Sequence, residues 1–421
     1  MPPTTPSLNP SSNTNMTPSK SEILALHGGK PLIHDPEKKA WLWPIFSAEE
    51  KAAANHVFER NPFTLYSEMV EFEKELCSYF GSRYALTSNN GTSAIHSAMH
   101  AIGLQPGDEV ITPSYTFWAT SMETRPCGAV PVFADIRAES ANIDPDDIRR
   151  KITPRTKAII VTHLWGMPCE MEEIMAIARE HKLRVIEDAS HAHGSEIRGK
   201  KIGTWGDIGC FSMQGSKLLP AIEGGFLLTD DFDLYARCCS LGHYGRVPND
   251  HPAHALNSTG LGYKYRIHPA STAIARIRLQ TLDLQNEAIS RRVARVTERI
   301  AKLKGIKPFV TPAHMKRVHY QFEVIYEKEK TGVPKEKIIE ALNAEGAYVA
   351  NERYPLQHLQ PVYKMKEYWS VSPTIPPSLP VSEKSQQSII QLPNFGTCEE
   401  ELVDQYILAF EKVWSQLDRL L

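Results

Sequence analysis

The chain has 421 residues, of which 42% are hydrophobic and 23% are charged. Its 47 Lys and Arg residues nearly balance its 49 Asp and Glu residues, so the formal net charge is −2. This balance gives no global electrostatic basis for binding nucleic acid or an anionic membrane. No run of 18 apolar residues is present, and we therefore expect no transmembrane helix.

The N-terminal segment 1–22 is rich in Pro, Ser, Thr and Asn and has no apolar stretch typical of a secretory signal. We expect it to form a disordered tail. The rest of the chain is long enough for a large domain at 23–285 and a smaller one at 286–421. Seven cysteines without a C-x-x-C pair argue against a disulfide framework or a zinc site, and favour reduced thiols in a cytoplasmic protein.

Short apolar strands alternate with helical patterns between residues 84 and 230. Strands are predicted at 84–88, 109–113, 130–134, 158–163, 184–188, 208–213 and 225–229. Helices are predicted at 92–103, 117–125 and 170–181. This alternation predicts an α/β fold with a mostly parallel sheet covered on both faces. Ligands of such sheets bind at the carboxyl ends of the strands.

The pattern changes after residue 268. One long helix is predicted at 268–306, where it would link the two domains, with a helix broken along this stretch as the alternative. A strand is predicted at 318–326, helices at 335–345 and 399–420, and a Pro-rich loop at 373–380. These elements indicate a smaller α+β domain.

The first candidate for chemistry is Lys217, in the small-residue loop FSMQGSK at 211–217. An amine in such a loop could form an imine with an aldehyde cofactor. This requires an unprotonated lysine, which a partly desolvated, electropositive site favours. Alone, the loop is weak evidence, because most lysines in Gly- and Ser-containing loops are solvated surface groups.

The second candidate is Asp188, which ends an apolar strand 29 residues before Lys217. A carboxylate in this position can pair with the ring nitrogen of a heteroaromatic cofactor and keep it protonated. A helix N-cap or a metal ligand are the alternatives. His191 and His193 would suit a metal, but no third ligand follows at a metal-binding spacing.

Two further segments carry possible binding groups. SNNGTSA at 88–94 predicts a strand, a Gly turn and the first turn of a helix, which is a suitable anion site for a phosphate. An ordinary N-cap by Asn90 or Thr92 explains it equally well. PSYTFWAT at 113–120 places three aromatic residues at a strand–helix junction, where one could stack on a flat ring or only pack in the core. The order of all four segments is more informative than any one of them.

From about residue 24 to the C-terminus, the sequence resembles the DegT/DnrJ/StrS family of aminotransferases, which use pyridoxal 5'-phosphate (PLP) and act on keto-sugars and related carbocycles. The matching segments include NGTSA at 90–94, GDEVITPSYTFWA at 107–119, IEDASHAHG at 186–194, EGG at 223–225 and LGYKYR at 261–266. The resemblance implies the aspartate-aminotransferase-like type I PLP fold. It also implies a homodimer whose active sites use residues of both chains.

The resemblance implies a role for each matching residue. Lys217 would form the Schiff base with PLP and move the proton of the 1,3-shift, and Asp188 would bind the pyridine nitrogen. Phe117 would stack on the ring, with Trp118 as the alternative. The phosphate would be held by Gly91, Thr92, Ser93 and Ser212.

The remaining candidates lie around the ring and the substrate. His191 stands where the family usually has Gln, near the ring hydroxyl. His193, Tyr354 and His358 are candidate substrate contacts. For Tyr354 and His358, packing of the smaller domain is an equally good explanation.

Two positions depart from the family pattern. Ile222 replaces a Gly, and a backbone conformation that only Gly adopts easily would be strained there, so we expect a reshaped loop. Lys264 replaces an Asn that usually reaches the phosphate bound by the partner subunit. Lys264 is expected to reach the same phosphate as a cation, with a solvent-facing side chain as the alternative.

The implied reaction moves an amino group from Glu or Gln to a ketone on a sugar, cyclitol or related carbocycle by ping-pong half-reactions. The segment QGSKLL at 214–219 resembles members that aminate cyclitol ketones, and it favours a small ring without a nucleotide. One rival is a PLP-dependent sugar dehydratase, but those enzymes have His in place of Lys217. The other rival is a non-catalytic PLP-binding regulator or partner subunit.

Overall fold

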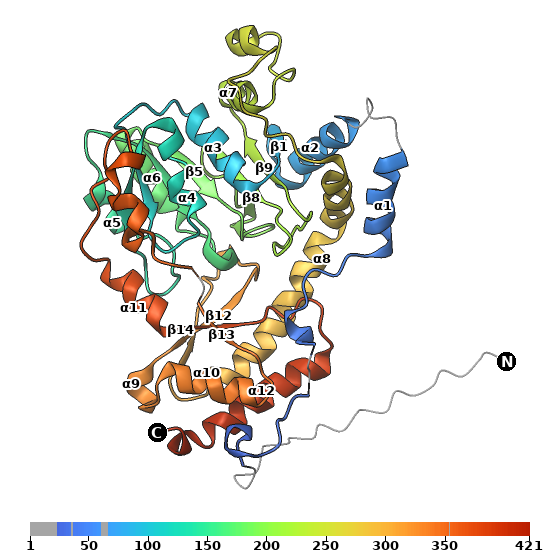
Figure 1. The fold of residues 1–421 in the computed structure, drawn as a ribbon, viewed down its shortest axis with the longest axis vertical. Helices are drawn as coiled ribbons and strands as arrows, with labels where there is room; N and C mark the ends of the chain where they lie inside the picture. Colours follow the sequence, from blue (N-terminus) through green and yellow to red (C-terminus); the bar gives the residue numbers. More distant parts are fainter. Residues whose placement is uncertain (1–22, 35–36, 60–65, 353) are drawn as a thin grey trace, which may run out of the picture.

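The computed structural model describes residues 23–34, 37–59, 66–352 and 354–421, and the tail predicted at 1–22 lies outside these ranges. Figure 1 shows a larger upper part built around a sheet and a smaller lower part, with the long helix α8 (Pro269–Ile300) running between them. At 32 residues, α8 is about 48 Å long. The domain boundary at 285/286 stays a prediction, and it would fall within this helix.

The upper part is organised by a seven-stranded sheet of order β1-β9-β8-β5-β4-β2-β3. Only β9 is antiparallel to its neighbours, which confirms the mostly parallel α/β sheet expected from the sequence. The strands are β1 (Tyr84–Ser88), β2 (Glu109–Pro113), β3 (Val130–Ala134), β4 (Thr156–Thr162), β5 (Arg184–Asp188), β8 (Ile208–Ser212) and β9 (Gly225–Thr229).

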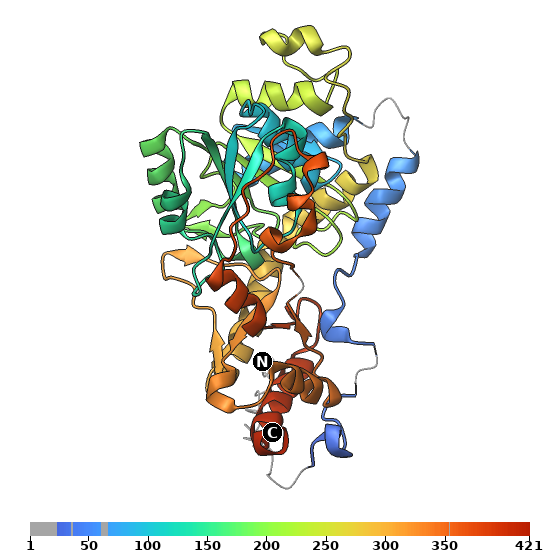
Figure 2. The same cartoon turned by 60° about the vertical axis from the view of Figure 1, so that its left-hand side comes forward.

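Both faces of this sheet are buried, which explains why its strands are apolar throughout. On one face, Ile160 and Ile186 pack with residues of α3 (Gly91–Ala101) and α7 (Phe232–Gly242). On the other, Val161 and Val185 pack with α2 (Tyr66–Phe80), α6 (Met171–His181) and α8. The helices therefore cover both faces, as Figures 1 and 2 show.

The lower part has its own antiparallel sheet, of order β10-β12-β14-β13. Its strands are β10 (Ile306–Pro308), β12 (Phe322–Tyr326), β13 (Ala350–Asn351) and β14 (Ile389–Leu392), and α10 (Lys335–Ala344) and α12 (Glu400–Trp414) pack beside it. A small sheet of β6 (Glu196–Ile197), β7 (Lys200–Lys201) and β11 (Met315–Lys316) pairs the two halves of the chain.

Buried ion pairs fasten the N-terminal segment to distant parts of the chain. The carboxylate of Glu345 accepts hydrogen bonds from the backbone N–H groups of Ala25 and Leu32 and pairs with Lys412 at 2.9 Å. In the same way, Glu50 on α1 (Ala48–Glu59) pairs with Arg278 on α8. Figures 1 and 2 show α1 lying beside α8. Removing one partner of such a pair would leave an uncompensated buried charge.

Several predicted elements are shorter in the structure. The long helix ends at Ile300 rather than 306, and a turn follows in which Gly305 is left-handed (φ 84°) directly before β10. The strand expected at 318–326 covers only 322–326, since Val318 and Tyr320 bond to the side chains of Ser195 and Asn394 instead of a strand. The helices expected at 117–125 and 399–420 are reduced to α4 (Ala119–Met122) and α12.

The loop that carries Lys217 keeps the conformation that we expected to be lost. Ile222 has φ 67°, so a β-branched residue occupies the left-handed region and the expected reshaping at this position was wrong. The loop is closed by backbone hydrogen bonds from Gly215 N–H to Ile222 O and from Ala221 N–H to Met213 O. These bonds hold Ile222 in place, and the strain is of the order of 1–2 kcal/mol.

Replacing Ile222 with Gly should therefore stabilise the protein. The side chain is 60% exposed, so little apolar burial is lost. Relief of the left-handed strain exceeds the entropy cost of Gly, and we expect the free energy of unfolding to rise by about 0.5–1 kcal/mol. Denaturant unfolding of the PLP-bound protein measures this. The matched control is Val310→Gly, at a residue that is 76% exposed and not left-handed, where stability should fall. A lower stability of Ile222→Gly would contradict the assignment of strain.

Candidate active site

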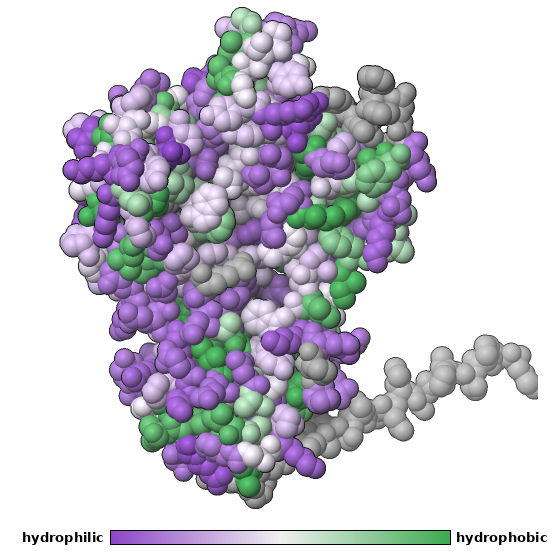
Figure 3. Space-filling view, viewed as in Figure 1, coloured by the Kyte–Doolittle hydropathy of each residue, from purple (hydrophilic) through white to green (hydrophobic). Residues whose placement is uncertain are grey.

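A cavity of about 870 Å³ lies at the carboxyl edge of the seven-stranded sheet. Figure 3 shows that this side of the molecule is hollowed near its centre, at the level where the upper and lower parts meet. Nine of the residues predicted from the sequence line the cavity, and they come from five separate stretches of the chain. They are Gly91, Thr92, Ser93, Phe117, Asp188, His191, Ser212, Lys217 and Tyr354.

The N-terminus of α3 forms one end of the cavity. Asn90 caps this helix, because its side-chain oxygen accepts hydrogen bonds from the N–H and the hydroxyl of Ser93. The first turn of a helix carries unpaired N–H groups and the positive end of the helix dipole, which suit an anion. Gly91 is required here, since a Cβ atom at this position would lie 2.7 Å from the Cβ atom of Ser212.

Two aromatic rings lie at the mouth of the cavity. Phe117 and Trp118 are 43% and 46% exposed, and their ring centroids are 4.9 Å apart with a tilt of 40°. Both line the cavity, so both remain candidates to cover a flat ligand. Tyr115, the third aromatic residue of this junction, is fully buried and packs edge-on against Trp165, as an ordinary core residue does.

Asp188 lies at the end of β5, and both of its carboxylate oxygens accept hydrogen bonds. Thr120 Oγ1 donates to Oδ2 at 2.7 Å, and the backbone N–H of Ser190 donates to Oδ1 at 3.2 Å. The residue is almost completely buried, yet it lines the cavity. A carboxylate held in this way can pair with a cationic ring nitrogen without being free to rotate.

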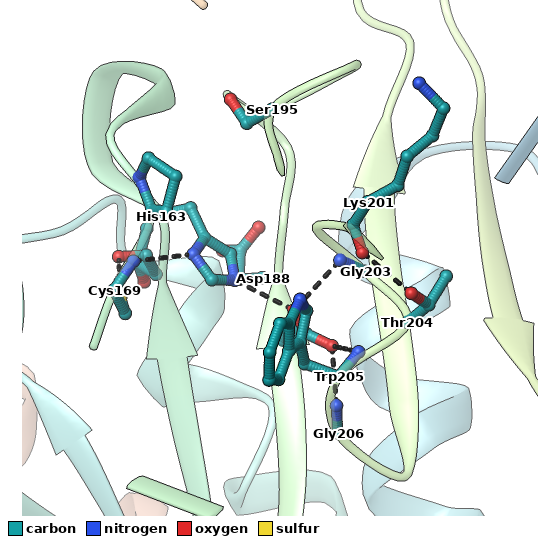
Figure 4. A network of polar contacts seen from close by, with 12 residues as sticks. His163, Cys169, Asp188, Ser195, Lys201, Gly203, Thr204, Trp205 and Gly206 are labelled. Atoms are coloured by element: carbon teal, nitrogen blue, oxygen red, sulfur yellow. Dashed lines mark hydrogen bonds and ion pairs between the residues drawn. The ribbon is translucent and has the colours of Figure 1, made fainter. Parts of the chain in front are cut away.

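The neighbouring Glu187 points to the other side of β5 and has a different function. Its carboxylate accepts N–H groups from Gly203, Trp205 and Gly206, and it meets His163 Nε2 at 3.1 Å (Figure 4). Burial acts to raise the pKa of Glu187, but the hydrogen bond and charge of His163 and the backbone N–H groups outweigh it and hold the pKa below its usual value. Glu187 therefore fixes the loop after β7 and takes no part in the cavity.

Lys217 is held by contacts from three distant segments. Trp43 Nε1 donates to Lys217 O at 3.0 Å, and Gln285 Nε2 donates to Leu218 O at 2.9 Å. The Nζ atom of Lys217 lies 4.3 Å from the centroid of the Tyr320 ring, which is close enough for a cation–π contact. The backbone is thus fixed, while the amine extends into the cavity.

His191 belongs to a stack of rings next to this amine. Its ring lies 4.3 Å from that of Tyr320 at an angle of 24°, and Tyr354 stacks beyond it at 5.7 Å. Nδ1 of His191 accepts the N–H of Trp165 at 3.2 Å, so Nε2 carries the proton of the neutral ring and faces the Tyr354 hydroxyl at 3.2 Å. Tyr354 therefore reaches the cavity from the C-terminal half of the chain.

Three predicted residues do not line this cavity. His193 is buried against Phe211 and Phe226, and burial, with the nearby charge of Lys217, lowers its pKa to about 3. His358 bonds to Ser114 Oγ at 2.6 Å and to Glu383 at 3.2 Å, as a link between the two parts of the fold. Lys264 is exposed on the surface of this chain.

The cavity also contains residues to which the sequence assigned no role. They include Ser216, Glu223 and Gln214, which flank Lys217 in the sequence, and Tyr320, which lies 103 residues beyond it. Proximity to Lys217 was a usable signal for the first three. For Tyr320 no local signal exists, because the ring reaches the site only through the packing of the two parts.

The arrangement fits PLP. The N-terminus of α3 suits a phosphate, Phe117 or Trp118 a flat ring, Asp188 a ring nitrogen and Lys217 an aldehyde. These groups converge on one cavity that is large enough for a cofactor and a small substrate. Among the described residues, no cluster of His, Cys, Asp and Glu side chains is arranged to hold a metal ion. Nor is any described helix long and apolar enough to span a bilayer.

Comparison with known proteins gives the same result. The profile of the DegT/DnrJ/EryC1/StrS aminotransferase family matches residues 44–411. The chain is 35% identical to GDP-perosamine synthase of Caulobacter vibrioides over 347 residues, which cover 82% of this chain and 90% of that one. It is 32% identical to a putative L-glutamine:3-amino-2,3-dideoxy-scyllo-inosose aminotransferase of Micromonospora echinospora over 348 residues, or 80% and 81% of the two chains.

Solved structures agree with the fold. The structure of an aminotransferase from Psychrobacter cryohalolentis superposes with a TM-score of 0.82 at 27% identity, and covers 90% of this chain and 99% of that one. The chain therefore belongs to the DegT/DnrJ/EryC1/StrS aminotransferase family, and it is a PLP-dependent aminotransferase with the type I fold that its sequence predicted.

Proposed function

We propose that this enzyme transfers an amino group from L-glutamine or L-glutamate to a ketone on a small sugar or cyclitol ring, in two ping-pong half-reactions at Lys217. The observation that carries the proposal is the convergence of Lys217, Asp188 and the N-terminus of α3 on one cavity. Bound PLP supplies an aldehyde that accepts the amine and a ring that accepts electrons. The chain supplies the groups that hold the cofactor and move the proton.

Each residue has a role that follows from its position. The N–H groups of Gly91 and Thr92 bind the phosphate with the hydroxyl of Ser212, while Ser93 also stabilises the cap of the helix. Asp188 keeps a proton on the ring nitrogen. The Nζ atom of Lys217 removes the proton from the α-carbon of the donor and delivers it to C4′, the carbon atom attached to the cofactor ring. His191 lines the same cavity and would contact the ring hydroxyl.

The proposed acceptor is a ring without a nucleotide. The segment 214–219 supports this choice, and the relative from Micromonospora echinospora is named for an aminocyclitol ketone and L-glutamine. GDP-perosamine synthase is named for a nucleotide-linked sugar, so nucleotide-sugar ketones are the competing class. Tyr354 would meet the acceptor, since it lines the cavity and its hydroxyl contacts His191.

We also propose that the enzyme is a homodimer with shared active sites. The segment 261–266 presents exposed apolar side chains, of which Leu261 and Tyr263 are 44% and 43% exposed, next to the exposed Lys264. An exposed apolar segment of this kind is typical of an interaction surface. In a dimer, Lys264 would reach the phosphate bound by the partner chain.

Lys217→Ala should abolish amino transfer and the visible absorbance of the bound cofactor, because Lys217 is the only lysine among the described residues that line the cavity. Turnover and absorption spectra of the PLP-loaded protein measure both effects. Lys157→Ala, at an exposed lysine outside the cavity, is the control and should behave as the wild type. Amino transfer by Lys217→Ala at a rate close to that of the wild type would overturn the role of Lys217.

The donor and the acceptor can be tested separately. PLP-loaded enzyme mixed with L-glutamine or L-glutamate should release one equivalent of 2-oxo acid per site, with much less release from L-alanine. The enzyme carrying the amino group should then aminate a cyclitol ketone faster than a nucleotide-linked keto-sugar. The reverse order would reject the proposed acceptor class. Normal absorbance without transfer to either class would favour the non-catalytic partner role.

The proposed homodimer can be tested by measuring the mass of the protein in solution. The wild type should sediment at twice the mass of one chain at micromolar concentration. Leu261→Asp should shift this equilibrium toward the monomer, because the charge would have to be buried at the interface. Val310→Asp, at an exposed residue far along the chain, is the control. A monomeric wild type that still binds PLP tightly would contradict the shared site.

A further inference from the structure

A cluster of three buried threonine hydroxyls bonds to Asp188. Thr120 Oγ1 donates to Asp188 Oδ2 at 2.7 Å, Thr116 Oγ1 lies 2.9 Å from Thr120 Oγ1, and Thr162 Oγ1 lies 3.0 Å from Thr116 Oγ1. Thr116 and Thr120 are fully buried and Thr162 nearly so. Burying a hydroxyl group without a hydrogen bond costs free energy. The hydrogen bonds among these three hydroxyls and Asp188 therefore compensate for their burial.

The charge of Asp188 determines the direction of the hydrogen bonds that Thr120 makes. An ionised carboxylate only accepts, so Thr120 must donate its one proton to Asp188. Thr120 Oγ1 therefore accepts from its two threonine neighbours, from Thr116 at 2.9 Å and from Thr162 at 3.4 Å. Hydrogen bonds aligned head to tail polarise one another and become stronger than isolated ones.

The three hydroxyls are also placed rigidly. Thr120 lies on α4, Thr116 follows β2 and Thr162 ends β4, next to Asp188 in the sheet. The β-branched side chains have few χ1 rotamers. With Ser190 N–H on its other oxygen, the carboxylate is held from two sides. Its remaining lone pairs are left for a ligand in the cavity.

We propose that Thr120 is a positioning residue of this enzyme, which sets the orientation and hydrogen bonding of Asp188 against the cofactor ring without touching the cofactor. The proposal rests on the proposed pairing of Asp188 with the ring nitrogen. Thr120 does not line the cavity, whereas Thr116 and Thr162 do. Its effect on PLP is therefore indirect and passes through the groups that it bonds, of which Asp188 is the charged one.

The test compares Thr120→Val, which keeps the shape and removes the hydroxyl, with Thr120→Ser, which keeps the hydroxyl. The PLP-free chain is titrated with PLP, and the visible absorbance of the bound cofactor is then followed against pH. Thr120→Val should raise the dissociation constant of PLP about tenfold, the effect of losing a hydrogen bond to a charged group. It should also move the pH midpoint upward, because a ring nitrogen with less positive charge repels a second proton less.

Thr124→Val is the matched control. Thr124 is also fully buried and its hydroxyl bonds to Ser121 O, with no contact to Asp188. It should lower the thermal midpoint as Thr120→Val does, without changing the PLP dissociation constant or the pH midpoint. Thr120→Ser should restore both of these values toward the wild type.

Two outcomes would overturn the proposal. One is a Thr120→Val protein with the PLP affinity and pH midpoint of the wild type, and the other is an equal change in both values for Thr124→Val. The variant Asp188→Asn shows whether a negative result concerns only the role of Thr120 or also the proposed role of Asp188. If Asp188→Asn changes both values and Thr120→Val changes neither, only the role of Thr120 is lost. If Asp188→Asn changes neither, the role of Asp188 itself is wrong.

Discussion

The close approach of α3 to the end of β8 is the contact on which the site depends. A Cβ atom at Gly91 would meet Ser212, and one at Gly225 would lie 2.5 Å from the backbone of Asn90. Gly225 is paired in the sheet with both Ser88 and Ser212, so three segments meet there without side chains between them. This packing brings the anion-binding helix terminus within one cavity of the loop that carries Lys217. Larger residues would separate the two halves of the cofactor site.

Two adjacent acidic residues on β5 have different functions because their side chains lie on opposite faces of the sheet. Successive side chains of a strand point to opposite faces. Glu187 therefore faces backbone N–H groups and His163, where its charge is fully used in holding a loop. Asp188 faces the cavity and is held by one hydroxyl and one backbone N–H among the described residues, so it can still accept a ligand. The identical chemistry of the two carboxylates gives no hint of this difference, which comes entirely from the alternation of the strand.

Much of this arrangement was predictable from the sequence, and the reasons for the failures are physical. The sheet strands are apolar because both faces are buried, so their pattern identified them. The helix α1 was not recognised, since only two of its described residues are buried, and one of them is the charged Glu50, which pairs with Arg278 on α8. The conformation of Ile222 was predicted wrongly because backbone hydrogen bonds within the loop outweigh the preference of a single residue. Tyr320 could not be found, because its place beside Lys217 depends on the packing of elements that are remote in sequence.

The position of Lys217 depends on the packing of the whole chain. Its backbone carbonyl is held by Trp43 from the N-terminal segment, and the next carbonyl is held by Gln285 from α8. Arg278, on the same helix as Gln285, bonds to Gln285 and pairs with Glu50 on α1. The amine itself lies over Tyr320, which belongs to the C-terminal half. Proton transfer is sensitive to small displacements of the acting group. The contacts that fasten the N-terminal segment to α8 are therefore part of the geometry of catalysis, although none of them lies in the cavity.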